Sequence, residues 1–277
     1  MVNVLKIGAD IEMFLQNKKG KIVSAEGYVK GTKYNPFVFD PENKYFSTSL
    51  DNVMAEFTIP PVDDRKNFIE YIKRGIGYIN TINPDLKCIA QPAARLDWEY
   101  LKTENAQMFG CEPDMNAYTM WTNPRPKAEG KNLRTAGFHV HISYENPYPV
   151  YDLVNPDETY IKNDTIRCII TKAMDLFLSV NMVLIEPENE RKVLYGKAGA
   201  YRPKPYGLEY RSLSNYAASS PKMMGYVFDQ TLRALKWLER EKNQTLINSK
   251  GFSEYLENTI NQNNKKQAKY LKNKFKI

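Results

Sequence analysis

Three segments of the chain each place two polar side chains two residues apart, and this spacing is the main chemical signal in the sequence. The pairs are Asp10 with Glu12, His139 with His141, and Glu209 with Arg211. In a strand, side chains two residues apart lie on the same face, so each pair points in one direction. One such pair alone is typical of an exposed strand face. However, the chain has only two histidines, and imidazole is a common metal ligand and phosphate contact, so the pairs predict a functional site.

Two further carboxylates extend this set. Glu56 lies in an otherwise apolar strand segment and faces the same way as Met54 and Thr58, which places it at a sheet edge or in a site. Asp51 can share that face only if the chain turns or bulges at Asn52. The resulting set of four or five carboxylates and one or two imidazoles favours Mg²⁺ or Mn²⁺ over zinc. Because so many acids would repel one another, two ions are expected rather than one.

Basic residues gather in the segment that leads into and includes the last pair, where glycines are interspersed at positions 196, 199 and 207. They are Arg191, Lys192, Lys197, Arg202, Lys204 and Arg211. The segment is either a solvated loop or a loop whose backbone approaches a polyphosphate. Metal-bound carboxylates beside phosphate-binding arginines are typical of nucleotide-dependent phosphoryl transfer. The sequence has no Walker A motif and no Gly-x-Ser-x-Gly, and nothing near Cys111 would activate it as a nucleophile.

The periodicity of apolar residues predicts the elements that position these groups. Strands are expected at 4–15, 22–25, 53–60, 88–96, 137–144 and 208–213, and helices at 65–83, 164–186 and 221–242. Residues 33–50 are predicted to form a long loop or short irregular strands, and residues 103–135 an extended surface loop. The mixed order of these elements favours an α+β fold around a mainly antiparallel sheet.

Composition and charge exclude several classes. The chain has 277 residues, of which 42% are hydrophobic and 26% charged, as in globular proteins. We expect no membrane span and no secretion signal, and the three widely spaced cysteines favour a reducing, cytoplasmic compartment. The net charge is +7, and residues 260–277 carry six lysines and no acid. We expect a frayed, solvated helix there; contact of this tail with nucleic acid is the less favoured alternative.

Four motifs together resemble the carboxylate–amine ligase (amidoligase) family of phages and bacteria, within the glutamine synthetase/glutamate–cysteine ligase superfamily. They are GADIEMF (8–14), DNVMAEF (51–57), LRTAGFHVHIS (133–143) and YGKAGAYRPKPYGLEYRSLS (195–214). The resemblance implies an antiparallel sheet curved into a half-barrel, with helices packed on its convex face. It implies a catalytic domain over residues 1–245, followed by a helical, Lys-rich tail over 246–277. If the chain is phage-encoded, its compartment is the host cytoplasm.

The resemblance also implies a role for each candidate residue. One ion would be held by Glu12, Glu56 and Asp51, and a second by Asp10, His139 and Glu209. His141, Lys197 and Arg134 would contact the nucleotide. Arg202 and Arg211 would act with Glu209 in catalysis by stabilising charge on the transferring phosphoryl group. The segment CEPDMNAY (111–118) resembles the variable acceptor-side loop of the family.

The implied activity joins a small-molecule or peptide carboxylate to an amine, using ATP and two Mg²⁺ or Mn²⁺ ions, through an acyl phosphate. Two alternatives remain open at this point. One is a small-molecule kinase with the same fold, and the other is a non-catalytic nucleic-acid-binding protein that acts through the basic tail. Related enzymes often form dimers or rings, so an oligomer is also an expectation.

Overall fold

The computed structural model describes residues 4–107, 114–124, 126, 131–144, 156–187 and 190–277. The strands of its main sheet are β1 (Val4–Asn17), β2 (Ile22–Val23), β3 (Gly31–Thr32), β4 (Asn35–Val38), β5 (Ser47–Asp51), β6 (Met54–Val62), β7 (Leu86–Ile89), β9 (Met115–Asn116), β11 (Phe138–Tyr144), β12 (Ala200–Lys204) and β13 (Gly207–Tyr210). Their order is β3-β4-β5-β6-β1-β11-β13-β12-β9, and β2 and β7 also pair with β1. Among the described residues, β3 and β5 pair in parallel, whereas the other strand pairs of this sheet are antiparallel. Separately, β8 (Ala93–Arg95) pairs with β10 (Leu133–Thr135).

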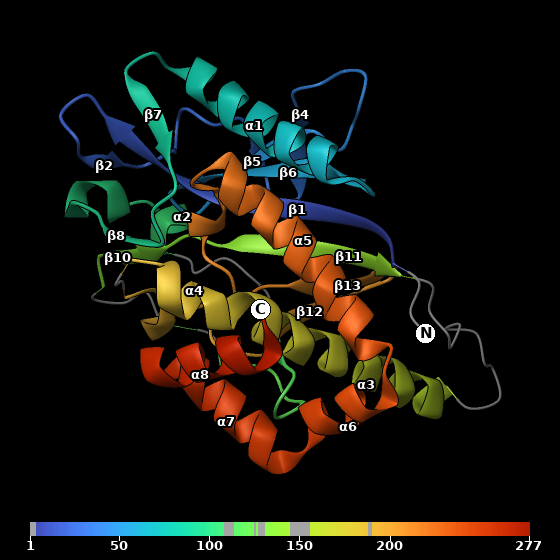
Figure 1. The fold of residues 1–277 in the computed structure, drawn as a ribbon. Coiled ribbons are helices and arrows are strands. Elements are labelled where there is room, and N and C mark those ends of the chain that lie inside the picture. Colours follow the sequence, from blue (N-terminus) through green and yellow to red (C-terminus); the bar gives the residue numbers. More distant parts are fainter. Residues whose placement is uncertain (1–3, 108–113, 125, 127–130, 145–155, 188–189) are drawn as a thin grey trace.

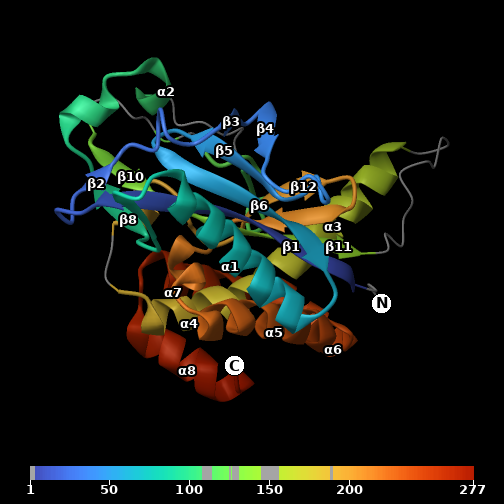
Figure 2. The same ribbon diagram turned by 90° about the horizontal axis from the view of Figure 1, so that it is seen from above.

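The longer helices cover one face of this sheet, which confirms the α+β class (Figures 1 and 2). The helices are α1 (Arg65–Ile82), α2 (Glu104–Gln107), α3 (Pro156–Met174), α4 (Val180–Ile185), α5 (Pro221–Leu238), α6 (Glu241–Asn248), α7 (Lys250–Asn261) and α8 (Lys265–Phe275). A π-helical segment, Asp175–Ser179, joins α3 to α4. Helix α1 begins after Asp64, whose side chain accepts a hydrogen bond from the Asn67 amide at 2.8 Å, and Ser220 caps α5 in the same way.

The two faces of the sheet differ in character because side chains alternate along each strand. In β1, Ile7, Ala9 and Ile11 are buried in the main hydrophobic core, together with Phe57 of β6 and Val140 of β11. The interleaved polar residues point to the other face. The helices therefore cover the apolar face, and the polar face carries the predicted site residues.

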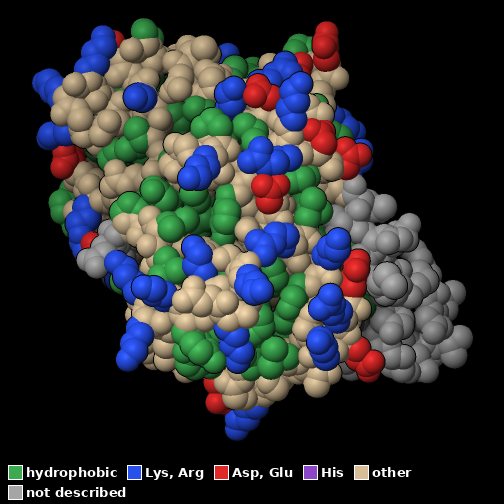
Figure 3. Space-filling view, viewed as in Figure 1, with side chains coloured by type: hydrophobic (Ala, Val, Ile, Leu, Met, Phe, Trp, Pro, Cys, Tyr) green, Lys and Arg blue, Asp and Glu red, His purple; other side chains and the backbone are tan. Residues whose placement is uncertain are grey.

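Helices α7 and α8 pack onto the core, so the predicted frayed and solvated chain end is wrong, although its helical character is confirmed. Leu256 and Leu271 are fully buried, and Ile260 is 1% exposed. The lysines of α8 lie at exposed or half-exposed positions around this apolar side. Lys and Arg side chains are scattered over the helical face of the molecule (Figure 3). The basic chain end is thus the outer surface of a packed helix.

The structure agrees with one of the two loop predictions and contradicts the other. Residues 33–50 include the short strands β4 and β5, which agrees with the prediction of short irregular strands. The extended surface loop predicted over 103–135 is wrong in its described parts, which contain α2, β9 and β10. Ala106, Ala117 and Leu133 are buried there. Cys111 lies outside the described residues.

The helical segment Asp164–Ile185 is long and apolar enough, by length and composition alone, to cross a membrane. However, 78% of its apolar window is buried inside the protein. The segment runs through the end of α3, the π-helical segment and α4, and it packs against α5, α7 and α8. Its composition is therefore that of a core helix.

Candidate functional site

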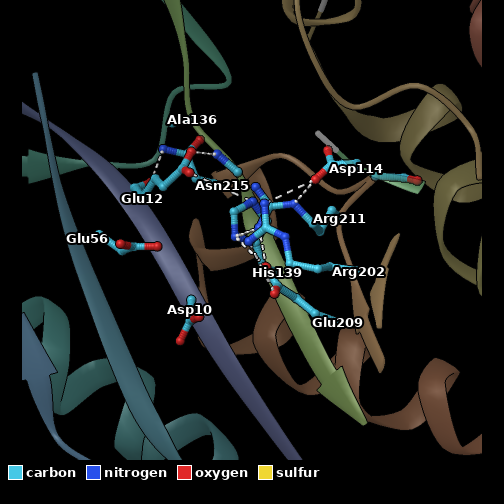
Figure 4. Close-up of polar contacts among 12 residues, drawn as sticks. Asp10, Glu12, Glu56, Asp114, Ala136, His139, Arg202, Glu209, Arg211 and Asn215 are labelled. Atoms are coloured by element: carbon cyan, nitrogen blue, oxygen red, sulfur yellow. Dashed lines mark hydrogen bonds and ion pairs between the residues drawn. The ribbon is translucent and has the colours of Figure 1, made fainter. Parts of the chain in front are cut away.

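The strand register brings the three predicted pairs into one row on the polar face of the sheet (Figure 4). Glu12 of β1 lies opposite Glu56 of β6. On the other side of β1, Asp10 lies opposite His139 of β11. His141 lies in turn opposite Glu209 of β13. The strands β1, β11 and β13 thus bring the spacing-two pairs together, and the neighbouring β6 adds Glu56.

The predicted turn at Asn52 is confirmed. Asn52 joins β5 to β6 with a φ of 56°, in the left-handed region, so Asp51 ends one strand of a hairpin and pairs with Met54. The side-chain amide of Asn52 donates a hydrogen bond to the Ala106 carbonyl at 2.9 Å. This turn brings Asp51 to the cavity that Glu12 also lines.

One group of possible metal ligands consists of Glu12, Glu56 and His139, whose donor atoms lie within 4.8 Å of one another. His139 Nε2 lies 3.8 Å from Glu12 Oε1. Glu56 Oε2 accepts a hydrogen bond from Ser49 Oγ at 2.9 Å, and Glu12 Oε2 accepts one from the Gly137 amide at 2.5 Å. These outer bonds orient both carboxylates.

The second group consists of Asp10, His141 and Glu209, so the two histidines are distributed differently from the prediction. Asp10 faces the backbone of His139 across the strand pair, but its Oδ2 lies 2.8 Å from His141 Nε2, on the diagonal neighbour. Such diagonal contacts are within reach of long side chains. His139 remains close to this group as well, because its Nδ1 lies 3.5 Å from Glu209 Oε1.

Burial and mutual repulsion dominate the electrostatics of the first group. Burial, followed by the charge of Asp51, raises the pKa of Glu12 to about 8. The same two causes raise the pKa of Glu56 well above its ordinary value. Burial, followed by the charge of Arg211, lowers the pKa of His139 well below its ordinary value. Without an ion, this environment therefore favours the protonated form of both carboxyls and the neutral form of the imidazole.

The second group is held in its charged form. Burial alone would raise the pKa of Asp10, but the charge and hydrogen bond of His141 outweigh it, so this pKa is lowered. Burial likewise opposes ionisation of Glu209, but the charges of Arg211 and His141 lower its pKa well below the ordinary range. Two ionised carboxylates can bind a cation without first losing a proton.

Basic side chains surround Glu209 on the side away from β1. Lys204 Nζ lies 2.8 Å from Glu209 Oε2, Arg202 Nη1 lies 3.6 Å from the same oxygen, and Arg211 Nη1 contacts Oε1. Arg211 Nε also lies 2.7 Å from Asp114 Oδ1. The structure therefore brings Arg202 and Arg211 to the carboxylates, as predicted.

Two predicted nucleotide contacts lie in a different setting. The guanidinium of Arg134 is buried and donates to the carbonyls of Ala106 (2.7 Å) and Leu133 (2.9 Å) and to Asn52 Oδ1 (2.9 Å). Its donors thus hold the Asn52 turn against the α2 segment, which is a structural role. Lys197 is exposed, and its carbonyl accepts a hydrogen bond from Ser212 Oγ at 2.9 Å.

Three residues of the site were not selected as site residues from the sequence. Asp114 lies within the segment that resembles the acceptor-side loop (111–118), and it pairs with Arg211. Arg191 was noted only as part of the basic cluster; it is buried and donates to the Ala136 carbonyl at 3.0 Å and the Ser212 carbonyl at 3.1 Å. Tyr206 contacts His141 Nδ1. Only its place in a Lys-Pro-Tyr-Gly turn beside the basic cluster could have drawn attention to it.

Two cavities flank the row of ligands. A small one of about 40 Å³ lies at the Glu12 end and is lined by Asp51, Asp114, Arg191 and Arg211, among others. A larger one of about 360 Å³ lies at the other end. Its lining includes Lys6, Asp10, Tyr45, Thr58, His141 and Tyr206. The row of carboxylates thus separates a small, highly charged space from a larger, partly aromatic one.

Comparison with known proteins adds chemistry to this geometry. Residues 161–262 match the family described as phage phiEco32-like COOH.NH2 ligase-type 2. The resemblance to carboxylate–amine ligases is confirmed. A crystal structure of a bifunctional glutathione synthetase from Pasteurella multocida is similar at 11% identity and a TM-score of 0.42, over 98% of this chain and 49% of that one. The chain thus spans about half the length of that protein, and no curated protein sequence matches it.

The segment that matches the ligase family contains only part of the site. Arg202, Glu209 and Arg211 lie inside residues 161–262. The carboxylates of β1 and β6 and both histidines precede it. The assignment of ligands on those strands therefore rests on the geometry of this chain.

The donor set of this site fits divalent cations. Each group offers two carboxylates and one imidazole, which suits an oxygen-preferring ion such as Mg²⁺ or Mn²⁺. Asp10 Oδ1 is buried and has no hydrogen-bond partner among the described residues. A buried carboxylate oxygen without a partner is unfavourable unless a cation binds it.

A glycine beside the first group gives a prediction. A Cβ added at Gly137 would lie 2.5 Å from His139 Nε2, so the Gly137→Ala variant must displace the imidazole. We expect its affinity for Mn²⁺ at this group to fall by about 10-fold or more, the range seen when ligand orientation is lost. Isothermal titration with Mn²⁺ measures this. Gly77→Ala is the control, because a Cβ there meets nothing within 4 Å; equal affinity in all three proteins would contradict the geometry.

Proposed function

We propose that the protein is an ATP-dependent carboxylate–amine ligase that forms an amide or peptide-like bond through an acyl phosphate. The observation that carries this proposal is the row of two ligand groups next to Arg202, Lys204 and Arg211. Carboxylates that hold cations beside basic side chains that contact phosphate are the apparatus of phosphoryl transfer. The ligase-family match supplies the acceptor chemistry.

The chemistry explains why ATP is needed. Hydroxide is a poor leaving group, so the substrate carboxylate attacks the γ-phosphorus of ATP in line, and the bond between that phosphorus and the departing ADP oxygen breaks. Arg202, Lys204 and Arg211 offset negative charge on the transferring group. The amine then attacks the acyl carbon, loses a proton and expels phosphate from a tetrahedral intermediate. Divalent ions, when bound, neutralise phosphate charge and orient the phosphates.

The two cavities suggest where the substrates bind. The cavity of about 360 Å³ has the volume and the aromatic wall, Tyr45 and Tyr206, that a nucleoside requires. We infer that the nucleotide enters there and that its phosphates reach the row of carboxylates. The acid and the amine then meet at the Glu12 end, where cationic Arg191 and anionic Asp114 line the small cavity. A space of about 40 Å³ holds only a few waters, so larger substrates require this end to widen.

The fold of the glutamine synthetase superfamily is part of the same proposal. In that fold the sheet curves into a half-barrel and the site lies on its concave face. The position of the polar row, on the face opposite α1 and α5, supports this. The proposal also assigns one ion to Asp10, His141 and Glu209 and another to Glu12, Glu56 and His139, with Asp51 beside it.

Binding of ATP is the direct test. Isothermal titration of the full chain should show ATP binding that requires Mg²⁺, and Glu209→Ala should weaken it at least about 10-fold. Glu254→Ala is the matched control, since that carboxylate lies on α7 and is exposed. ATP binding that is absent, or that is unchanged in Glu209→Ala, would contradict the proposed site.

Product analysis separates ligase from kinase. Reactions with ATP, Mg²⁺ and pooled amino acids, peptides and modified nucleosides are analysed by mass spectrometry. A ligase yields ADP, free phosphate and a product equal to acid plus amine minus one water. A kinase yields ADP and a stable phosphorylated compound without free phosphate, and that result would replace the ligase proposal.

A further inference from the structure

The net charge of the chain is concentrated in its last four helices. Residues 221–277, which form α5 to α8, contain twelve Lys and Arg but five Asp and Glu, an excess of seven that equals the net charge of +7 of the whole chain. Within them, residues 258–277 contain six lysines and no acid. These helices lie on the face of the sheet opposite the candidate site (Figures 1 and 2). The excess charge therefore belongs to a surface that the proposed ligase chemistry does not use.

Helix α8, which carries the six lysines, is fixed on the protein at both ends. The side chain of Asn264 accepts a hydrogen bond from the Gln267 amide at 3.1 Å and caps the first turn. At the other end, Arg233 of α5 donates to the Lys276 carbonyl at 2.6 Å. Leu271 is fully buried on the side of the helix that packs onto the core. The opposite side of α8 is consequently held toward solvent in a fixed orientation.

One row of lysines follows this outer side. Lys265, Lys269 and Lys272 succeed one another at spacings of four and three residues, so they lie on one helix face, about 5–6 Å apart at their Cβ atoms. Lys265 also stands in the first turn, which contains no acid. A cation is unfavourable there, because the helix dipole is positive at that end. The row therefore costs helix stability, which an anionic ligand would offset.

A second row combines lysines with an aromatic ring. Lys266, Tyr270 and Lys274 are spaced four residues apart, so the ring lies between two cations. Tyr270 is 53% exposed, and its ring packs edge-on against Tyr255 of α7, with 6.3 Å between the ring centroids. Lys274 Nζ lies 5.5 Å from the centroid of the Tyr270 ring. The outer side of α8 therefore presents a supported aromatic ring among ammonium groups.

We propose that the outer side of α8 binds single-stranded nucleic acid, with the lysines on phosphates and Tyr270 stacked on a base. Ammonium groups bind the phosphate backbone, and aromatic rings between them stack on bases that no second strand covers. An anionic membrane is a poorer match, because a membrane-surface helix inserts its apolar side, whereas Ala268 and Leu271 pack into the core. An acidic peptide would pair with the lysines but leave the ring without a stacking partner. This binding goes beyond the proposed ligase activity and does not depend on it.

The first test measures the contribution of the lysines. A fluorescently labelled oligothymidylate of about 20 nucleotides is titrated with the full chain at several salt concentrations, and its anisotropy is followed. The variant combines Lys265→Gln, Lys266→Gln and Lys269→Gln, which also removes two cations from the positive end of the helix dipole. We expect its affinity at about 50 mM salt to fall at least about 10-fold. The plot of log affinity against log salt concentration should become less steep by about 2, since each phosphate contact with a single strand contributes about 0.7.

The matched control removes the same charge elsewhere. It combines Lys18→Gln, Lys19→Gln and Lys21→Gln in the exposed turn between β1 and β2, where Lys18 pairs with Asp85 and Lys21 with Asp97. Its affinity and salt dependence should match those of the unaltered protein. An equal loss in both triple variants would reduce the effect to net charge and overturn the assignment to α8.

Tyr270 separates stacking from charge. Tyr270→Leu keeps an apolar side chain beside Tyr255 but removes the aromatic face, so affinity should fall about 5-fold or more, the effect of losing one stacked base. Its salt dependence should not change, because no cation is lost. Tyr270→Phe keeps the aromatic face and should bind as the unaltered protein does. Equal affinity in Tyr270→Leu and Tyr270→Phe would overturn the stacking role and, with it, the choice of a single strand.

Other probes test the competing partners. Vesicles that contain phosphatidylserine, or polyglutamate, would overturn the proposal if they bound more tightly than the oligonucleotide and lost binding in the α8 lysine variant. Absence of oligonucleotide binding at about 50 mM salt would overturn it as well. ATP binding in the presence of Mg²⁺ should be the same in the α8 lysine variant and the unaltered protein, because α8 lies across the sheet from the candidate site. Failure of nucleic-acid binding therefore leaves the ligase proposal standing, and failure of ATP binding leaves the α8 proposal standing.

Discussion

Replacing Asp175 by Ala is expected to lower the free energy of unfolding by about 3–5 kcal/mol, because it leaves buried donors without an acceptor. Asp175 is fully buried behind the sheet. Its carboxylate accepts hydrogen bonds from Tyr210 Oη at 2.6 Å, Tyr118 Oη at 3.0 Å and the Gly199 amide at 2.6 Å. These donors come from three separate segments, so one side chain ties β13, the segment after β9 and the glycine turn to the π-helical segment.

Equilibrium unfolding in urea, followed by circular dichroism, measures the effect. Asp175→Asn keeps the shape and one acceptor oxygen, so its loss of stability should be smaller than that of Asp175→Ala. Ser179→Ala is the matched control: it removes only the second partner of Tyr210, at 2.6 Å, and should cost about 1 kcal/mol. A change below about 1 kcal/mol in Asp175→Ala would show that the network contributes little net stability.

The consequences of this network reach the candidate site. Tyr210 lies between Glu209 and Arg211 on β13, and its ring fills the core side of the strand. The Gly199 turn has a φ of 78° and leads directly into β12. Because Asp175 fixes both, it holds the two strands that carry Arg202, Glu209 and Arg211.

Local pattern was sufficient to predict the elements that carry the site. The alternation around Ile11 and Val140 predicted strands, because an apolar layer on one face leaves the polar partners together on the other. Pro221 at the first turn marked the start of α5, since proline is tolerated there. These features depend on neighbours within a few residues, which a single sequence displays directly.

Features that depend on distant contacts were not predictable in the same way. The role of Asp175 is one of these, because its partners Tyr118 and Gly199 are far away in sequence. The basic chain end was interpreted from its charge, but Ala268 and Leu271 form an apolar side that packs on the core. The regrouping of the histidines follows from the lean of side chains along paired strands, which spacing alone does not determine.

Glu12 gives the prediction with the largest expected effect on ion binding. Burial and Asp51 raise the pKa of Glu12 to about 8, so at pH 7 an ion must displace its proton. As the pH is raised toward 8, the apparent Mn²⁺ affinity at the group of Glu12, Glu56 and His139 should therefore increase about tenfold per pH unit for each displaced proton. Above pH 8 the affinity should level off. The pKa of Glu56 is raised in the same direction, so the slope can approach two protons.

The same pKa shift fixes the sign of the effect on stability. A carboxyl whose pKa is higher in the folded than in the unfolded protein binds more protons when folded. Glu12 therefore makes its full contribution to the stability of the ion-free protein below its unfolded pKa of about 4.5. The protein should lose this contribution as the pH rises through about 8. Saturating Mn²⁺ should abolish this loss, because the ion then neutralises the carboxylates.

Glu12→Gln isolates this group. Removal of a ligand should weaken Mn²⁺ binding by more than about 100-fold, beyond the 10–100-fold effect of losing an outer partner. Where binding remains measurable, the plot of log affinity against pH should lose about one unit of slope, since one titrating proton is gone. Titration in buffers of different ionisation enthalpy counts the released protons, and Glu254→Gln on α7 serves as the control. A slope that is the same in Glu12→Gln and the unaltered protein would mean that Glu12 is already ionised before the ion arrives. The buried acidic row would then be neutralised by Arg211 and Arg191, whose charges lower this pKa, rather than by protons.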